Sequence, residues 1–308
     1  MNLKAAVVDI GTNSCRLLIG EKNSAQSFDI LVRKLEITRL GEGIDQSRKL
    51  KKMAVERVFK ALKKYRVIID EYQIKKTRVI GTSALRDAAN SDILSDKLSQ
   101  LGFELEIISG KKEAELNYLG AASNLDAAFL LIDIGGGSTE FIWSDAAKIK
   151  FKSLDLGCVR MTEKFISKVD KKIKPAEANK INKYAQKLLS ANLNFGEKLK
   201  VKGVGGTITT LAAVKLGMEE YDSSRIENLK IKKIELEKII NNLSSLSLEK
   251  RKEIKGLQPK RADIIIAGLI ILKNILDYIN SSELYVSDHD LLYGLLKEEF
   301  MEAFSNGS

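Results

Sequence analysis

Two short turns carry the residue types suited to phosphate and metal chemistry. The segments Asp9–Ser14 and Asp133–Glu140 each close an apolar run, begin with Asp-Ile-Gly and continue with small hydroxyl residues. The carboxylate of such a turn could hold a metal ion, and its bare backbone N–H groups could bind a phosphate. Each turn leads one half of the chain, so the repeat predicts a duplicated fold whose halves face a cleft for one phosphorylated substrate.

Glycines and small hydroxyl residues at three turns are the predicted phosphate ligands. The third turn lies at residues 205–207, between a predicted strand and a predicted helix. Any one glycine pair could be a tight turn without a ligand, but three such turns favour phosphate binding, because glycine allows close approach to the backbone. The predicted ligands are Gly11, Thr12, Asn13, Ser14, Gly135, Gly136, Gly137, Ser138, Thr139, Gly205, Gly206 and Thr207.

Apolar periodicity predicts strands that alternate with helices. Strands followed by crossover helices imply mixed sheets covered by helices, which is the α/β class. The predicted strands are 5–9, 16–20, 78–80, 104–108, 128–132, 140–143, 148–151 and 200–204, and the predicted helices are 49–72, from 84, 111–120, from 158, from 175, from about 208, 233–247, 261–279 and 290–304.

Length and charge bound the domain organisation and the partners. The 308 residues, 44% of them apolar, predict two lobes, 1–124 and 125–308, with the last helix staying on the second lobe or packing back on the first. The 51 Lys and Arg residues exceed the 41 acids by ten charges, which favours a polyanionic partner. The same excess could equally reflect amino-acid usage, since the Lys residues are spread along helices.

Several classes of function are disfavoured by composition. Aromatic residues make up 6% of the chain and no zinc-finger or helix-turn-helix pattern is present, so nucleic-acid binding is not expected. Cys15 and Cys158 lie far apart in predicted core segments, which fits a reducing cytoplasm. No leader peptide is expected, because a core strand is predicted almost at the first residue, and the longest apolar stretch, 264–272, is too short to span a membrane. His289, the single histidine, is predicted in a solvated turn and excludes a His-rich metal site.

Five ordered motifs, at residues 5–17, 79–90, 108–114, 132–140 and 204–207, resemble the exopolyphosphatase and guanosine pentaphosphate phosphatase (Ppx/GppA) family. The resemblance covers essentially the whole chain, including its segments 256–263 and 286–288. It implies the duplicated actin-like (ribonuclease H-like) fold of sugar kinases and heat-shock ATPases, with two lobes and a central cleft. The chain looks like the short form, without the C-terminal domain that resembles metal-dependent His-Asp phosphohydrolases.

The resemblance also assigns roles to two charged residues. Glu113 aligns with the second Glu of the family's Ser-Gly-x-Glu-Glu-Ala motif, which implies the general base; alternatively it is an exposed Glu favoured by the helix dipole. Arg86 resembles the family's phosphate-contacting Arg, with a surface helix Arg as the alternative.

The chain departs from the family pattern at four positions. Lys112 replaces the first Glu of the motif and could lower the basicity of Glu113 or bind a phosphate, and Glu115 stands where Arg is common. Asp290 and Leu292 stand where the family has Gly and Arg, so guanosine or subunit contacts at that end are not inferred.

Three acids are the predicted metal ligands. Hydrolysis of a phosphoanhydride needs charge neutralisation on the transferred phosphoryl group and an oriented water. Asp9 and Asp133, at predicted strand ends, are expected to hold Mg²⁺ (or Mn²⁺). Glu140 resembles the family's second-loop acid, which implies that it positions the metal or the water. The alternative for each acid is a strand-end residue that hydrogen-bonds its own loop. Arg16 falls on a strand and is assigned no role.

These residues predict a Mg²⁺-dependent phosphohydrolase that removes the terminal phosphate of inorganic polyphosphate or the 5′ γ-phosphate of pppGpp, with Glu113 activating water. The expected ligands are polyphosphate or guanosine penta- and tetraphosphate, and analogy with relatives suggests a homodimer. Two other hypotheses stay open: a non-catalytic sensor of polyphosphate or (p)ppGpp, and an ATPase or kinase on the same scaffold.

Overall fold

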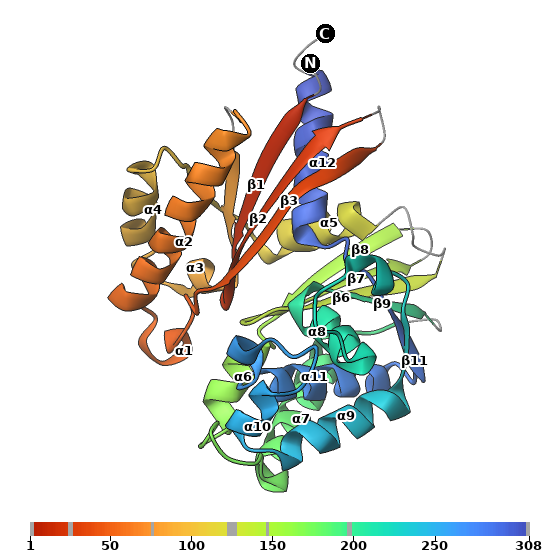
Figure 1. The fold of residues 1–308 in the computed structure, drawn as a ribbon. Helices are drawn as coiled ribbons and strands as arrows, with labels where there is room; N and C mark the ends of the chain where they lie inside the picture. The colour runs from red at the N-terminus through yellow and green to blue at the C-terminus, as the bar shows by residue number, and fades with distance from the viewer. Residues whose placement is uncertain are drawn as a thin grey trace. The chain divides into compact units, whose positions relative to one another are not determined.

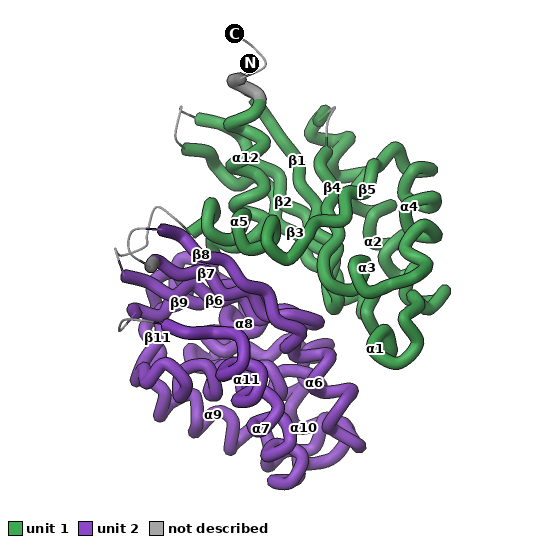
Figure 2. Tube along the Cα trace, turned by 180° about the vertical axis from the view of Figure 1, so that it is seen from behind, with its two compact units in different colours: residues 1–122, 289–308 green, residues 123–288 purple. Residues whose placement is uncertain are grey.

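The chain divides into two compact units (Figure 2). The computed structural model describes residues 3–23, 27–74, 77–121, 128–145, 148–195 and 199–305. Unit 1 comprises residues 1–122 and 289–308, and unit 2 comprises residues 123–288. The boundary expected after residue 124 lies outside the described residues. The second lobe expected over 125–308 does not keep its last helix, because α12 (Leu291–Ser305) belongs to unit 1 and packs on α5 (Gly110–Ala121).

Unit 1 is built on a mixed five-stranded sheet of order β3-β2-β1-β4-β5 (Figure 1). β1 pairs antiparallel with β2 and parallel with β4, and β5 continues parallel to β4. The three parallel strands therefore end at the same edge of the sheet. The strands are β1 (Lys4–Ile10), β2 (Ser14–Lys22), β3 (Phe28–Ile37), β4 (Thr77–Gly81) and β5 (Leu105–Ile107).

Alternating side chains bury both faces of this sheet. Val8 lies in one apolar cluster with Val58 of α2 (Lys52–Glu71), whereas its neighbour Val7 lies in another with Leu295 of α12. This alternation follows from the two-residue period of a strand. Asp9 has the parity of Val7, so the sheet directs its carboxylate to the face covered by α12. The remaining helices of unit 1 are α1 (Ile44–Ser47), α3 (Ser83–Asp87) and α4 (Asp92–Ser99).

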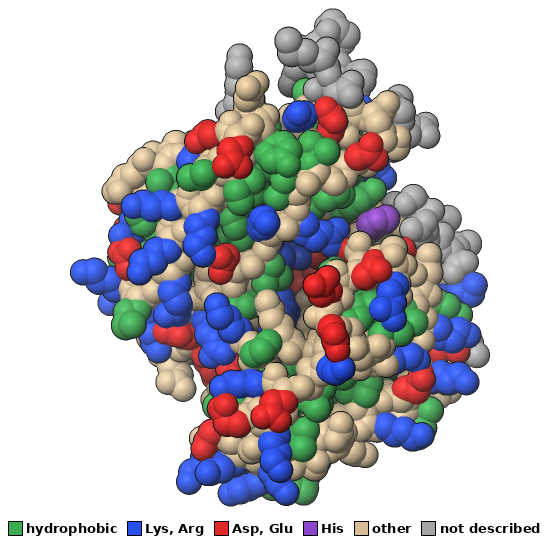
Figure 3. Space-filling view, in the orientation of Figure 1, with side chains coloured by type: hydrophobic (Ala, Val, Ile, Leu, Met, Phe, Trp, Pro, Cys, Tyr) green, Lys and Arg blue, Asp and Glu red, His purple; other side chains and the backbone are tan. Residues whose placement is uncertain are grey.

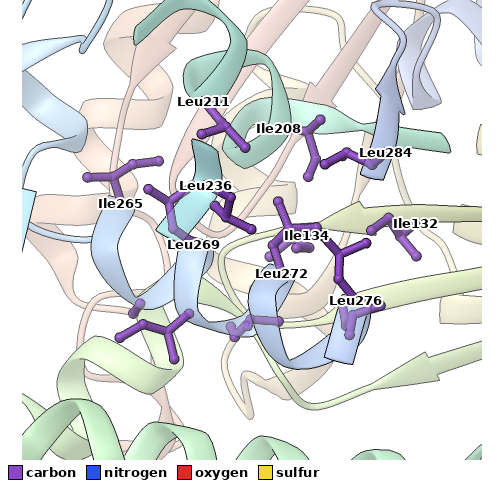
Figure 4. Close-up of a cluster of buried hydrophobic side chains, with 14 of the residues drawn as sticks. Ile132, Ile134, Ile208, Leu211, Leu236, Ile265, Leu269, Leu272, Leu276 and Leu284 are labelled. Carbon is purple, nitrogen blue, oxygen red and sulfur yellow. The ribbon is translucent and has the colours of Figure 1, made fainter. Parts of the chain in front are cut away.

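Unit 2 is built on a mixed six-stranded sheet of order β10-β11-β9-β6-β7-β8. Isoleucines of β6 pack with Ile208 of α8 and with leucines of α11 in its core (Figure 4). Within the described ranges, no helix has both the length and the apolar character needed to cross a membrane. The elements are β6 (Phe129–Ile134), β7 (Thr139–Asp145), β8 (Lys148–Leu154), α6 (Cys158–Phe165), α7 (Pro175–Asn192), β9 (Lys200–Val204), α8 (Gly205–Leu216), β10 (Lys230–Lys232), α9 (Lys233–Ser245), α10 (Leu248–Lys252), α11 (Ile265–Tyr278) and β11 (Glu283–Val286).

The predicted elements agree with the structure best where a strand is buried. The strand predicted over 200–204 has the same bounds in the structure. β3 was not predicted, because it is an edge strand whose residues are mostly half-exposed or exposed and whose apolar and charged residues do not alternate strictly. The helix predicted over 261–279 begins later, at Ile265, because Pro259–Arg261 forms a 3₁₀ turn before it. The Lys and Arg side chains are scattered among acids over the face shown in Figure 3.

Candidate functional site

In the first Asp-Ile-Gly turn, between β1 and β2, the carbonyl oxygens of Thr12 and Asn13 accept hydrogen bonds from the neighbouring segment 38–41. The Gly11 N–H donates to the Ser14 carbonyl over 2.9 Å, and N–H groups from segment 38–41 donate to the carbonyls of Thr12 and Asn13 over 2.9–3.0 Å. A planar trans peptide points each carbonyl opposite to the following N–H. The N–H groups of Asn13 and Ser14 therefore point away from segment 38–41, as a backbone anion site requires.

The second turn, between β6 and β7, repeats this construction in unit 2. The Gly135 N–H donates to the Ser138 carbonyl over 2.9 Å. The first turn of α6 donates to the carbonyls of Gly135 and Gly136, each over 2.9 Å, and Arg160 Nε donates to the Gly137 carbonyl over 2.7 Å. The following N–H groups, of Gly136, Gly137 and Ser138, therefore point away from α6. This turn also offers an array of donors to an anion.

The third turn joins β9 to α8. The N-cap residue of α8, Val204, provides no side-chain hydrogen bond, so the first N–H groups of this helix suit an anion.

Two predicted hydroxyl ligands donate to backbone carbonyls of the chain. Thr139 Oγ1 donates to the Leu156 carbonyl and Thr207 Oγ1 to the Ile134 carbonyl, and both residues are buried. Any phosphate contact of Thr139 or Thr207 then falls to the backbone, and their predicted role stays a prediction.

Asp9 is the cross-strand partner of Arg16, and the two side chains form a partly buried ion pair. Arg16 Nε and Nη2 both reach Asp9 Oδ2, over 2.9 and 2.6 Å, while Arg16 Nη1 reaches Asp290 Oδ2. Burial raises the pKa of Asp9 although Arg16 acts to lower it. Asp9 Oδ1 is buried and accepts no hydrogen bond from the described residues. The structure therefore leaves one oxygen of Asp9 for the predicted metal.

Asp133 occupies the matching position of the second turn, but its cross-strand partner is Glu140. Directly opposed residues of an antiparallel pair share a face, with Cβ atoms about 5 Å apart. Both side chains are buried, and Ser153 Oγ donates to Glu140 Oε1 over 2.7 Å. Two neighbouring carboxylates fit the oxygen ligands of a hard divalent cation. Over the described part of the chain, no group of three or more His, Cys, Asp or Glu side chains is arranged to hold a metal.

The predicted base and the predicted phosphate-binding arginine contact each other in unit 1. Arg86 Nη1 donates to Glu113 Oε2 over 2.7 Å and to the Ile108 carbonyl over 3.0 Å. Glu113 is 7% exposed, so it is not the exposed helix-start residue that was the alternative. The pair lies at the ends of β4 and β5, on the sheet edge where β1 ends at Ile10.

The sequence model of the Ppx/GppA phosphatase family matches residues 7–302. The chain belongs to this family. A Ppx/GppA family member from Aquifex aeolicus aligns over the full length of both chains with 27% identity and a TM-score of 0.82. The duplicated actin-like α/β fold implied by the motifs is thereby confirmed.

Curated relatives of this Ppx/GppA chain carry several names. A bifunctional 3-dehydroquinate synthase/phosphatase from Fusobacterium nucleatum is 42% identical, over 96% of this chain and 46% of that protein. Exopolyphosphatase 2 from Mycobacterium tuberculosis is 30% identical, over 95% of this chain and 97% of that protein. A guanosine-5′-triphosphate,3′-diphosphate pyrophosphatase from Vibrio vulnificus is 30% identical, over 96% of this chain and 59% of that protein. The chain therefore spans about half the length of the first relative and less than two thirds of the third.

Sequence reasoning missed two arginines of this Ppx/GppA chain. Arg16 was assigned no role, although the hairpin register places it opposite Asp9; its seven-residue spacing, the same as from Asp133 to Glu140, was the available signal. Arg261 lies against the third turn, since a Cβ on Gly206 would come within 2.1 Å of its Nη1. A guanidinium at that turn is a further candidate phosphate ligand.

Two other residues differ from expectation. Lys112 Nζ contacts Glu298 Oε1 of α12 over 2.6 Å, so its side chain is directed to an acid rather than being free for a phosphate. His289 is half-buried and stacks on Tyr293, with ring centroids 4.0 Å apart, so the prediction of a solvated turn residue was wrong. The stacking fits the start of α12, because a residue two positions before a helix can pack on its first turn.

Proposed function

We propose that this Ppx/GppA chain hydrolyses a terminal phosphoanhydride, of inorganic polyphosphate or of pppGpp at its 5′ γ-phosphate. The observation that carries the proposal is the buried Glu113, held by Arg86 at the sheet edge where the first Asp-Ile-Gly turn presents its N–H groups. The relatives named exopolyphosphatase and guanosine-5′-triphosphate,3′-diphosphate pyrophosphatase support the same class of substrate.

Glu113 is proposed to accept the proton of the attacking water. A general base must reach that water within hydrogen-bond distance, and a carboxylate fixed by a neighbour keeps its orientation. Arg86 fixes Glu113 through a single Nη1 contact, which leaves the rest of its guanidinium for a phosphate oxygen. The N–H groups of the turns are proposed to bind the phosphates in an orientation that permits in-line attack.

Asp133 and Glu140 are proposed to hold Mg²⁺ or Mn²⁺. Their shared face and burial suit a cation that is bound by few carboxylates and keeps several waters. Asp9 stays a further proposed ligand through Oδ1, because its other oxygen is committed to Arg16. When bound, the cation neutralises charge on the phosphoryl oxygens.

Phosphate release tests the proposal when long polyphosphate, tripolyphosphate, pppGpp and ATP are compared side by side, with and without Mg²⁺. Glu113→Gln is expected to lower turnover about 10²- to 10⁴-fold. Glu115→Gln is the matched control, because Glu115 lies on the same helix, is 39% exposed and pairs with Lys111.

The other hypotheses predict different results. Full turnover by Glu113→Gln contradicts the assigned base. Preferred turnover of ATP would indicate an ATPase or kinase. Binding of pppGpp or polyphosphate without turnover of any substrate by the wild-type chain would indicate a sensor.

A further inference from the structure

Arg16 is held between two carboxylates of unit 1. Its Nε and Nη2 bind Asp9 from β1, and its Nη1 binds Asp290, which directly precedes α12. The three side chains are 18%, 5% and 13% exposed, in the order Arg16, Asp9 and Asp290. A guanidinium presents its donors as a planar fork that matches two oxygens of a carboxylate or a phosphate. Here both sides of that fork already contact acids of the chain.

The fold fixes Asp290 in this position. The start of α12 crosses α5 with backbone against backbone: a Cβ on Gly294 would lie 1.8 Å from the Leu116 carbonyl oxygen, and one on Gly120 would lie 2.6 Å from the Asp290 carbonyl oxygen. Asp290 Oδ1 also accepts the Leu292 N–H over 3.0 Å. One oxygen of Asp290 therefore anchors the helix start while the other is presented to Arg16.

The position of Arg16 gives this contact a consequence for ligand binding. Arg16 follows the turn whose Asn13 and Ser14 N–H groups suit an anion, on the strand that leaves that turn. Arg16 is therefore the cation nearest in sequence to this anion site, yet two carboxylates share its one positive charge. A phosphate that approached the fork would have to compete with an acid that the fold holds in place.

We propose that Asp290 is a built-in competitor for phosphate at the Arg16 guanidinium, and that it thereby weakens binding of highly charged phosphate ligands to the first turn. The inference rests on the proposed function, because it takes phosphate to be the ligand of this turn. Asp290 acts as a specificity-determining residue and takes no part in the chemical step.

The test is the affinity for sodium tripolyphosphate, measured by isothermal titration calorimetry with EDTA at fixed ionic strength. Asp290→Asn is the first variant, since Asn can still accept the Leu292 N–H and cap the helix start. We expect tripolyphosphate to bind about 10-fold more tightly, because a charge-assisted hydrogen bond no longer competes with the ligand. Asp290→Ser, which also keeps a capping oxygen, should show a gain of the same size.

Glu299→Gln is the matched control. Glu299 is an acid of the same helix, 11% exposed, that pairs with Arg78 over 3.5 Å. It should change tripolyphosphate affinity less than twofold, which separates competition at Arg16 from a general loss of negative charge. In an Arg16→Lys background the gain from Asp290→Asn should shrink, because an ammonium lacks the fork.

Unchanged or weaker tripolyphosphate binding in both Asp290 variants would overturn the proposal. So would the unfolding of both variants, since Asp290 would then act only in the fold, and so would an equal gain in Glu299→Gln. Because binding is measured without turnover, the result is separate from the proposed hydrolase activity. Tighter binding by a chain that hydrolyses none of the substrates would support this inference while contradicting the proposed function.

Discussion

The β1–β2 turn of unit 1 and the β6–β7 turn of unit 2 share a backbone and differ in charge. Each closes with a glycine N–H donated to a serine carbonyl over 2.9 Å, and each places an aspartate opposite the residue seven positions later. In the first turn that residue is Arg16, which binds Asp9. In the second it is Glu140, a second buried carboxylate beside Asp133.

The duplicated fold requires the backbone conformation that the two turns share, whereas the chemistry depends on the charged residue opposite each aspartate. In both turns the carbonyl oxygens accept hydrogen bonds from neighbouring N–H groups, so the following backbone N–H groups can donate to a phosphate. The residue opposite each aspartate then determines whether a positive or a negative side chain lies beside it: Arg16 beside Asp9 and Glu140 beside Asp133. We infer unequal roles: the second turn provides the carboxylates for a cation, and the first provides a carboxylate that is largely committed to an arginine.

The largest expected effect compares the two aspartates directly. Asp133→Asn should lower kcat about 10³-fold, since a catalytic cation contributes several kcal/mol, whereas Asp9→Asn should lower it only about 10-fold. Phosphate release at saturating Mg²⁺ measures both. Equal losses would show that the two aspartates share the cation, as their matching sequence motifs alone suggest.

The second expected effect is on the free energy of unfolding when the residue opposite each aspartate, Arg16 or Glu140, is replaced. Arg16→Met leaves Asp9 and Asp290 without their shared cation, and should lower the free energy of unfolding by about 3 kcal/mol. Glu140→Gln keeps the shape of the side chain and should change the free energy of unfolding by less than about 1 kcal/mol in EDTA. Urea denaturation measures both variants. A larger loss in Glu140→Gln than in Arg16→Met would reverse the comparison.

The third expected effect lies at the parallel strands that follow the turns. Gly81 pairs with Ile10 of β1, and Gly205 directly follows Val204, which pairs with Asp133 of β6. A Cβ on Gly205 would lie 2.0 Å from Asp133 Oδ1, at a φ of +79°. Gly205→Ala should destabilise unit 2 by about 2 kcal/mol and reduce activity by displacing Asp133. Gly81→Ala meets Leu85 Cδ1 at 2.3 Å, a side chain that can move, and should cost about 1 kcal/mol. Thermal unfolding distinguishes the two, and equal shifts would contradict the special role of Gly205.

The smallest expected effect concerns the ion pairs that hold α12 in unit 1, where it places Asp290 beside Arg16. Burial acts to raise the pKa of Glu298, but hydrogen bonds from Lys112 and Arg78 outweigh it and lower the pKa below the ordinary 4.5. A lowered folded-state pKa adds stability above pH 4.5 that is lost as the pH falls. Glu298→Gln should therefore cost up to about 1 kcal/mol at pH 7, and its difference from wild type should shrink below pH 4.5. A difference that stays constant with pH would show that Glu298 contributes by packing alone.

Local patterns in the sequence determined the strands, the turns and the candidate carboxylates. The strand 200–204 carries Val201 and Val204 and runs directly into a glycine turn, and a turn that admits a phosphate needs glycine, so both could be predicted from neighbouring residues. The burial of Glu113 was beyond such patterns, because a glutamate in the first turn of a helix has the same local signature whether exposed or buried. The edge strand β3 was missed for a different reason, since its apolar run 30–32 is followed by two charged residues and therefore breaks the alternation that marks a strand.

Only the tertiary structure decided what each charged group contacts. Arg86 reaches Glu113 across 27 residues, and Arg16 reaches Asp290 across 274 residues, once α12 has packed on α5. The contact between Arg16 and Asp290 depends on the close approach of α5 and α12 at Gly120 and Gly294, which is set by the packing of apolar faces. The amino-acid sequence therefore determined the chemistry available to the chain. Packing determined which carboxylates face arginine and which face each other, because charge interactions depend on distances that only the folded chain establishes.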